Sequence, residues 1–199
     1  MALAMNDKVL TEAFGPSEGT ALRIKQVAMV ALGIMVLAIA AKIKIPMWPV
    51  PITMGTFAVL TIGAAYGPTL GLTTILGYMI IGALGFDVFA GSSAEAYGLT
   101  YMMGDTGGYL VGYVLATLAL GFLARAGWDR SMGKMALAML AGNALIYIPG
   151  LAWLGVLYGW DQPILQWGLT PFLIGDALKL GLAALLLPAV WKMIGDARK

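Results

Sequence analysis

The amino-acid sequence predicts an all-α membrane protein with six transmembrane helices. Of its 199 residues, 60% are hydrophobic and 11% are charged, and the mean hydropathy is +0.87. Soluble domains carry about 25% charged residues, so a chain so poor in charge is typical of an integral membrane protein. The length suits about six helices of roughly 20 residues, the length that crosses a bilayer.

Apolar runs separated by turn-forming residues define the six helices. The expected spans are residues 22–41, 52–66, 69–84, 106–123, 132–154 and 171–191. The Gly67-Pro68 pair predicts a tight turn between the second and third helices, and a glycine-rich connection precedes the fourth. The expected domain organisation is an N-terminal segment, a six-helix transmembrane domain and a short tail: residues 1–21, 22–194 and 195–199.

The distribution of basic residues predicts that both termini are cytoplasmic. With six crossings, one side of the membrane receives the N-terminus, the connection between the fourth and fifth helices, and the C-terminus. Most lysines and arginines fall there: Lys8, Arg23, Lys25, Arg125, Arg130, Lys134, Lys192, Arg198 and Lys199. The positive-inside rule makes this side cytoplasmic. Lys42 and Lys44 fall on the other side, with the tryptophans of an interfacial belt.

Several classes of chemistry lack the residues they need. The chain has no cysteine and no histidine, which excludes disulfides, thiolate metal sites and histidine acid–base catalysis. The net charge of +2 is too small to predict nucleic-acid binding. Gly133-Lys134 lacks the rest of a P-loop. No nucleophile–base pair is evident, so we do not expect an enzyme. We also expect no bound metal or cofactor.

Two opposite charges lie inside the last predicted helix. Asp176 and Lys179 are three residues apart and share one helix face. A charge at the bilayer centre costs about 2.5–3.5 kcal/mol on insertion scales, so both side chains should face the bundle interior. Intramembrane charges mark functional sites by default; the alternative is a structural ion pair that fixes helix packing.

The fifth predicted helix carries a polar residue at a similar depth. Asn143 lies four residues before Tyr147, on the same helix face. Asn143 could join helices by hydrogen bonds or contact a ligand. Since the fifth and sixth helices are antiparallel, Asn143 could converge with Asp176 and Lys179. An amide, a carboxylate and an ammonium together suit a small neutral group with N–H donors beside a carbonyl, such as a urea or a lactam.

The start of the fourth predicted helix, GDTGGYLVGY, offers a further site. Asp105 or Thr106 is the expected N-cap. Gly107 and Gly108 would let a ligand or another backbone approach closely. The N–H groups and dipole of this helix end could also favour an anion.

Five segments together resemble the BioY family, the biotin-specific S components of energy-coupling-factor (ECF) transporters. In chain order they read PVPITMGTFAVLTIGAAYGPTLGL, GFDVFAGSS, GDTGGYLVGY, GNALIYIPGLAWL and FLIGDALKLGLAA. They cover about residues 44–187. The resemblance implies an ECF S-component bundle in the bacterial cytoplasmic membrane that captures biotin from outside with high affinity. It implies a transmembrane coupling protein and two cytoplasmic ATPase subunits as partners, and biotin as the transported ligand.

The resemblance also assigns site residues. It implies that the biotin ureido ring is bound by Asn143, Asp176 and Lys179. It implies that the site is lined or closed by Tyr147, Tyr109 and the glycine-rich connection, for which we name Phe89, Gly91, Gly107 and Gly108. It implies an outer lid over Trp48 to Thr53, including Val50 and Pro51.

The chain departs from the family pattern in three places. Asp105 stands where the family commonly has proline, and the first helix has no Ala-xxx-Ala pair for docking the coupling protein. The outer loops offer no arginine for the biotin carboxylate, so backbone N–H groups, water or Lys42 and Lys44 are the candidate substitutes. Two other functions stay open: an S component for another vitamin, and a proton-coupled secondary transporter that uses Asp176 and Lys179 as a relay.

Overall fold

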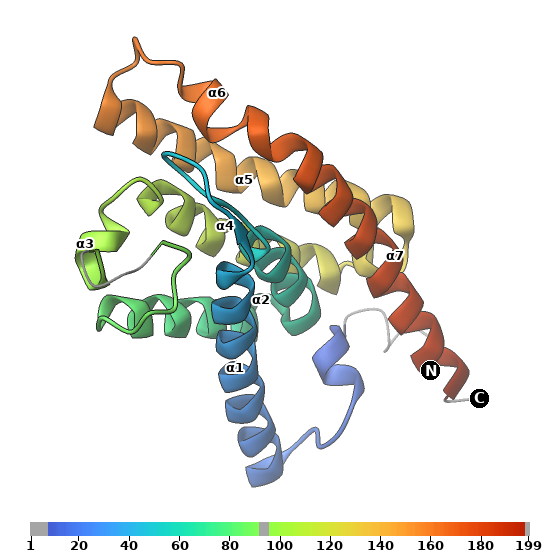
Figure 1. Cartoon of the computed structure of the whole chain (residues 1–199). Helices are drawn as coiled ribbons and strands as arrows, with labels where there is room; N and C mark the ends of the chain where they lie inside the picture. Colours follow the sequence, from blue (N-terminus) through green and yellow to red (C-terminus); the bar gives the residue numbers. More distant parts are fainter. Residues whose placement is uncertain (1–7, 92–95, 198–199) are drawn as a thin grey trace.

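The computed structural model describes residues 8–91 and 96–197, which form a bundle of α-helices (Figure 1). The ends of the two predicted terminal segments, residues 1–7 and 198–199, lie outside the described residues. The long helices are α1 (Gly19–Lys42), α2 (Gly55–Ala83), α4 (Gly107–Arg125), α5 (Met132–Tyr158) and α7 (Leu173–Ala197). Among the described residues, five stretches are long and apolar enough to cross a membrane: α1, α2, α4, α5 and Ile164–Gly195, which contains most of α7.

Short elements connect the long helices. They are η2 (Leu10–Ala13), β1 (Lys44–Ile45), β2 (Ile52–Thr53), α3 (Gly98–Met102), η3 (Trp128–Arg130), α6 (Ile164–Gly168) and η4 (Thr170–Phe172). The strands β1 and β2 pair antiparallel, with Lys44 opposite Thr53. Residues 52 and 53 were predicted to begin a helix; they belong to this hairpin instead, and α2 begins at Gly55.

The predicted second and third helices together form α2, whose backbone changes direction at Gly67 (Figure 1). Gly67 has φ +76° and ψ 179°, a conformation outside the helical region that glycine adopts without a Cβ penalty. A Cβ on Gly71 would lie 3.5 Å from the Cα of Gly63, so the two halves of α2 fold back on each other. The tight turn predicted at Gly67-Pro68 is therefore present, although α2 counts as a single candidate span.

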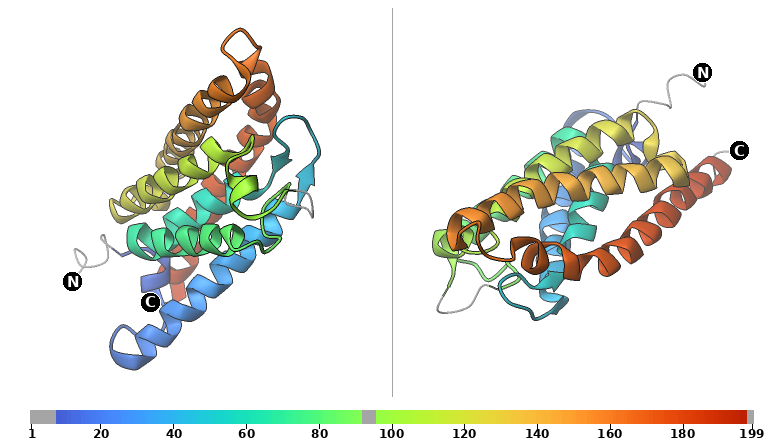
Figure 2. Two further views of the ribbon diagram at one scale, coloured as in Figure 1. Left: turned by 90° about the vertical axis from the view of Figure 1, so that its left-hand side faces the viewer. Right: turned by 90° about the horizontal axis from the view of Figure 1, so that it is seen from above.

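The helix α4 packs closely between α2 and α5. A Cβ on Gly121 would lie 2.4 Å from the backbone nitrogen of Pro68, and one on Gly112 would lie 2.6 Å from the Cα of Ile146. Such backbone proximity requires glycine, because the Cβ of any other residue would clash with the neighbouring backbone. In lipid, close van der Waals contact of this kind holds helices together, since there is no hydrophobic driving force between them. The neighbouring helices α5 and α7 run side by side along much of their length (Figure 2).

The N-terminal segment, the connection between α4 and α5, and the end of α7 meet at one end of the bundle (Figure 1). Val9 is fully buried there, and Arg130 donates a hydrogen bond to the carbonyl of Lys8 at 3.0 Å. Trp191 donates its indole N–H to Asp129, a carboxylate whose pKa is raised by burial. Both described ends of the chain are thus tied to the end that carries most basic residues.

Candidate functional site

The two charged residues of α7 form a buried ion pair. Lys179 Nζ lies 3.0 Å from Asp176 Oδ1, and it donates a second hydrogen bond of 2.9 Å to Thr56 Oγ1 on α2. Only 5% of Asp176 and 8% of Lys179 are exposed. The expectation that both residues face the bundle interior is met, because each charge finds an opposite charge or a dipole inside the protein.

Helix α5 contributes a third member to this cluster. The phenol of Tyr147 donates a hydrogen bond to Asp176 Oδ2, so each carboxylate oxygen of Asp176 receives one protein donor. Asn143, one helical turn before Tyr147, is 8% exposed, and its Oδ1 has no hydrogen-bond partner in the described part of the chain. A buried acceptor without a partner costs about 1–3 kcal/mol, which a ligand donor would recover. The pairs Asp176–Lys179 and Asp176–Tyr147 are therefore in place, whereas Asn143 bonds to neither residue of the ion pair.

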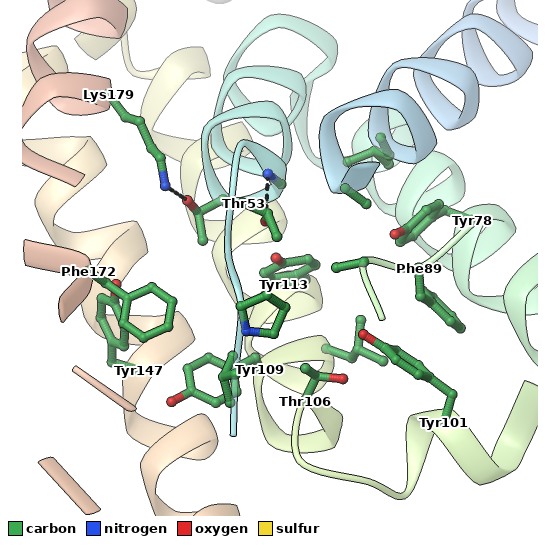
Figure 3. Close-up of a pocket in the computed structure, with 18 residues that line it drawn as sticks. Thr53, Tyr78, Phe89, Tyr101, Thr106, Tyr109, Tyr113, Tyr147, Phe172 and Lys179 are labelled. Carbon is green, nitrogen blue, oxygen red and sulfur yellow. Dashed lines mark hydrogen bonds between the residues drawn. The ribbon is translucent and has the colours of Figure 1, made fainter. Parts of the chain in front are cut away.

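A cavity opens beside Lys179 (Figure 3), and neither Asp176 nor Asn143 is among its described lining residues. It holds about 650 Å³ of atom-free space, including its open mouth. Most of its wall is apolar or aromatic, with Lys179 as its one ionisable cation among the described lining residues. Phe172 and Tyr147 lie on the Lys179 side, Tyr78, Phe89 and Tyr101 lie on the opposite side, and Tyr113 lies between (Figure 3). The arrangement suits a ligand with one polar end and an apolar body.

The face of α4 that lines the cavity comes from residues at helical spacing. Thr106, Tyr109, Leu110 and Tyr113 all lie on it. Tyr109 is held in place because its hydroxyl donates to the carbonyl of Gly168 at 2.8 Å. Thr106 is the N-cap, as predicted for Asp105 or Thr106, but its side chain makes no capping bond. Its buried Oγ1 has no partner among the described residues, so it is free to bind a ligand.

The hairpin of β1 and β2 covers the cavity. Val50, Pro51 and Thr53, predicted as lid residues, line it. Trp48 lies outside the lining and packs edge-on against Tyr158, with ring centroids 5.5 Å apart, and against Trp167 at 4.9 Å. The loop between β1 and β2 therefore reaches across to the end of α5 and to α6.

The connection after α2 closes the side of the cavity opposite Lys179. Phe89, predicted to line the site, does so; its ring stacks on Tyr101 with centroids 5.0 Å apart. Lys42 Nζ lies 2.6 Å from Asp87 Oδ1 and 2.7 Å from the carbonyl of Phe89, and Lys44 donates to the carbonyl of Ala90. The two outer lysines thus hold this connection instead of projecting into the cavity.

Three predicted glycines of the site lie outside the cavity wall. A Cβ on Gly107 would lie 2.4 Å from the carbonyl oxygen of Met102, and one on Gly108 would lie 2.3 Å from that of Pro149. These two glycines therefore let α4 approach its neighbours. Gly91 donates its backbone N–H to the hydroxyl of Tyr101 at 3.2 Å. Gly91 thus contacts a residue of the cavity wall, Tyr101.

Several wall residues were not predicted. Among them are Thr56, Tyr78, Tyr101, Thr106 and Tyr113, with Phe172 at the end of η4. Tyr113 lies four residues after Tyr109 and Thr106 three before it, so helical spacing from Tyr109 could have found both. No comparable signal in the sequence connects Thr56 with Lys179, because their contact spans 123 positions.

The sequence profile of the BioY family matches residues 12–196, which is most of the chain. The chain belongs to the BioY family. It is therefore a multi-pass membrane protein, in agreement with its five candidate spans.

BioY proteins of other organisms align with more than four fifths of the chain. The probable biotin transporter BioY of Pyrococcus horikoshii is 36% identical over 166 residues, which are 83% of this chain and 95% of that protein. The biotin transporter BioY of Thermotoga maritima is 29% identical over 163 residues, 82% of this chain and 94% of that protein.

A solved structure shows the same fold. It is the crystal structure of the S-component for biotin from an ECF-type ABC transporter, which matches with a TM-score of 0.74. The match covers 88% of this chain and 95% of that one at 21% sequence identity. At this identity the likeness establishes the S-component fold of this BioY family member, and the chemistry of its site has to be argued from its own residues.

Proposed function

We propose that this chain captures biotin and serves as the substrate-binding subunit of an ECF transporter. Family membership supports the proposal, since the curated relatives are named biotin transporters. The observation that carries it in this chain is the Asp176–Lys179 pair beside an aromatic cavity. Binding and release without covalent change need no catalytic residue.

Biotin fits this site by its chemistry. Its ureido ring has two N–H donors and one carbonyl acceptor, and its remaining ring and chain are largely apolar. The Asp176 carboxylate has about four lone-pair positions and receives one protein donor on each oxygen, so it can still accept ligand N–H groups. Lys179 uses two of its three donors on Asp176 and Thr56, which leaves one for a carbonyl.

The rest of the site would hold the apolar body of the ligand. The unpartnered Oδ1 of Asn143 lies one turn from Tyr147 and would accept, alongside Asp176, one of the two ureido N–H groups. Tyr109, Tyr113 and Phe89 offer ring surfaces for the fused rings and the chain. Val50, Pro51 and Thr53 of the lid would then separate the ligand from the outer solution. The roles of Gly91, Gly107 and Gly108 would be to position this wall.

The same proposal assigns a membrane topology. The two halves of α2 would cross separately, because the chain folds back at Gly67. With α1, α4, α5 and α7 this gives six crossings and places both termini on the cytoplasmic side, where most basic residues lie. The lid then faces outward, as biotin capture from outside requires.

Transport requires partners, for which we propose a transmembrane coupling protein and two cytoplasmic ATPase subunits. The sequence contains no P-loop of its own, which is consistent with ATP hydrolysis by other subunits. The loaded subunit would reorient on these partners and release biotin into the cytoplasm.

Calorimetric titration of the detergent-purified chain tests the proposed ligand. Biotin should bind tightly with about one ligand per chain, while thiamin and riboflavin should give no signal. Tight binding of another vitamin in place of biotin would reassign the substrate. Failure of all three ligands to bind folded protein would return Asp176 and Lys179 to a structural or proton-relay role.

A further inference from the structure

A second hollow lies at the basic end of the bundle, and we call it the N-terminal groove. It holds about 1760 Å³ of atom-free space, including its open side. Its walls are the first half of α1, the second half of α2, and the segment from Lys8 through η2 to Ser17. In Figure 1 the lower half of α1 diverges from the other helices, and η2 lies between it and α7. The groove is separate from the cavity beside Lys179, which has other lining residues.

The charges at the mouth of the groove are predominantly positive. Among its described lining residues, Lys8, Lys25 and Arg125 are cationic and Glu12 is anionic. Glu12 is paired with Arg125 at 2.6 Å. Lys25 donates to the backbone carbonyls of Thr11, at 2.6 Å, and Phe14. Among the side chains that the structure describes, those of residues 8–91 and 96–195, no carboxylate lies within ion-pair distance of Lys25 or Lys8.

The deeper wall of the groove is mostly apolar. Helix α1 contributes Val30, Ala31 and Ile34, and α2 contributes Leu70 together with the hydroxyl-bearing Tyr66, Thr69 and Thr73. The hydroxyls of Tyr66 and Thr73 are already bonded to backbone carbonyls. Polar lining residues, among them Ser17 and Gln26, lie near the basic mouth. The groove therefore combines an apolar channel between two membrane helices with an unneutralised ammonium group at one end. A ligand that matches both parts has an acidic head group and a hydrocarbon chain.

We propose that the N-terminal groove binds an anionic phospholipid. Its phosphate would lie against the ammonium groups of Lys25 and Lys8, and an acyl chain would run along Val30 and Ile34. Two features select a lipid over a helix of another protein. The groove opens where the cytoplasmic leaflet, which is rich in anionic lipid, supplies such molecules. An apolar helix would leave the charge of Lys25 without a counterion. This site does not depend on the identity of the transported vitamin.

The full chain can be tested by native mass spectrometry after exchange into phosphatidylglycerol or phosphatidylethanolamine, which differ in head-group charge. Lys25→Gln removes the central ammonium and should weaken phosphatidylglycerol retention about fivefold or more, as expected for one cation near a membrane surface. Ala31→Trp keeps all charges but fills the apolar channel, and it should also reduce retention. Lys192→Gln is the matched control, because Lys192 is an exposed lysine on α7 outside the groove.

The outcomes separate the alternatives. Preferential retention of phosphatidylglycerol by the wild type and Lys192→Gln, with loss in both groove variants, supports the site. Equal retention of the two lipids by the wild type overturns it. Equal loss in Lys25→Gln and Lys192→Gln would reduce the effect to nonspecific surface charge, and unchanged retention in both groove variants would also refute the proposal.

Discussion

Tyr147 on α5 and Asp176 on α7 are joined by a hydrogen bond that the phenol donates to the carboxylate. Lys179 donates to the other oxygen of the same carboxylate at 3.0 Å. The Asp176 side chain is therefore fixed from two helices before a ligand arrives. A fixed acceptor loses little conformational freedom on binding, which favours affinity.

Replacing Tyr147 by phenylalanine should weaken biotin binding. The change removes one donor to Asp176 and leaves the aromatic ring that lines the cavity. Without this bond the Asp176 side chain has to be ordered when the ligand binds, which costs about 0.5–1.5 kcal/mol, so we expect the dissociation constant to rise about twofold to tenfold. Calorimetry of Tyr147→Phe measures it, with Tyr97→Phe, an exposed residue outside the cavity, as the control. Equal affinities in the two variants would contradict the role of this bond.

The lid should release biotin faster when its aromatic contacts are removed. Trp48 packs edge-on against Tyr158 and Trp167, and each such pair contributes about 0.5–1.5 kcal/mol beyond burial. Trp48→Ala should therefore increase the dissociation rate of biotin about tenfold. Stopped-flow displacement with unlabelled biotin measures the rate. Trp160→Ala is the matched control, since Trp160 is 70% exposed against 62% for Trp48 and makes no aromatic ring pair among the described residues. A rate unchanged by Trp48→Ala argues against a lid.

The hydrogen bond between Tyr158 and Asp105 should also help to hold the lid closed, although neither residue lines the cavity. The hydroxyl of Tyr158 donates to Asp105 Oδ1 at 2.6 Å, which orients the ring that Trp48 contacts. Tyr158→Phe keeps the ring but loses this bond. We expect it to raise the dissociation rate less than Trp48→Ala does, in the same assay. A larger effect than that of Trp48→Ala would mean that Tyr158 acts by another route.

The close packing of α4 on the turn of α2 should be sensitive to a single methyl group. A Cβ on Gly121 would lie 2.4 Å from the backbone nitrogen of Pro68, whereas one on Gly133 meets no atom within 4 Å. Gly121→Ala should destabilise the protein by about 1–3 kcal/mol, the usual cost of overpacking. Gly133→Ala should be neutral or slightly stabilising. Thermal unfolding in one detergent compares the two, and equal melting temperatures would refute the packing argument.

Asp129 should make stability depend on pH. Burial raises its pKa above the ordinary value of 3.8, so the folded state favours the protonated form. Its contribution to stability is then greatest below about pH 3.8 and is lost as the pH rises through the raised pKa. The melting temperature of the wild type should fall relative to that of Asp129→Asn over this rise. A difference in melting temperature between the two proteins that stays constant as the pH rises would contradict the raised pKa of Asp129.

The sequence identifies the charged part of the site because the membrane makes it conspicuous. Asp176 and Lys179 stand out as charges in an apolar helix, and their spacing places them on one face. Tyr147 follows from Asn143 by helical spacing, but its bond to Asp176 depends on how α5 and α7 pack. That packing is a tertiary property. The sequence could therefore predict that Asn143 lies near Asp176 and Lys179, but not that it forms a hydrogen bond with neither of them.

The aromatic wall and the groove are harder to predict for the same reason. Gly107 and Gly108 have the composition of a ligand-contact loop, but their close neighbours are Met102 and Pro149. Nothing in the sequence marks Thr56 as a site residue, because its contact with Lys179 depends on how α2 packs against α7. The turn at Gly67-Pro68 is predictable from the sequence because it depends only on adjacent residues. Local chemistry and helical periodicity are therefore predictable from this chain, while contacts between distant helices are not.

The central claim is that the Asp176 carboxylate binds the ureido N–H groups of biotin. Calorimetric titration of biotin into Asp176→Asn tests it most directly, with Asp161→Asn, an exposed loop carboxylate, as the matched control. Asparagine keeps the size but loses the charge, so affinity should fall about tenfold to a hundredfold in Asp176→Asn and stay at the wild-type value in Asp161→Asn. Biotin affinity within about twofold of the wild type, in folded Asp176→Asn protein, would contradict the account.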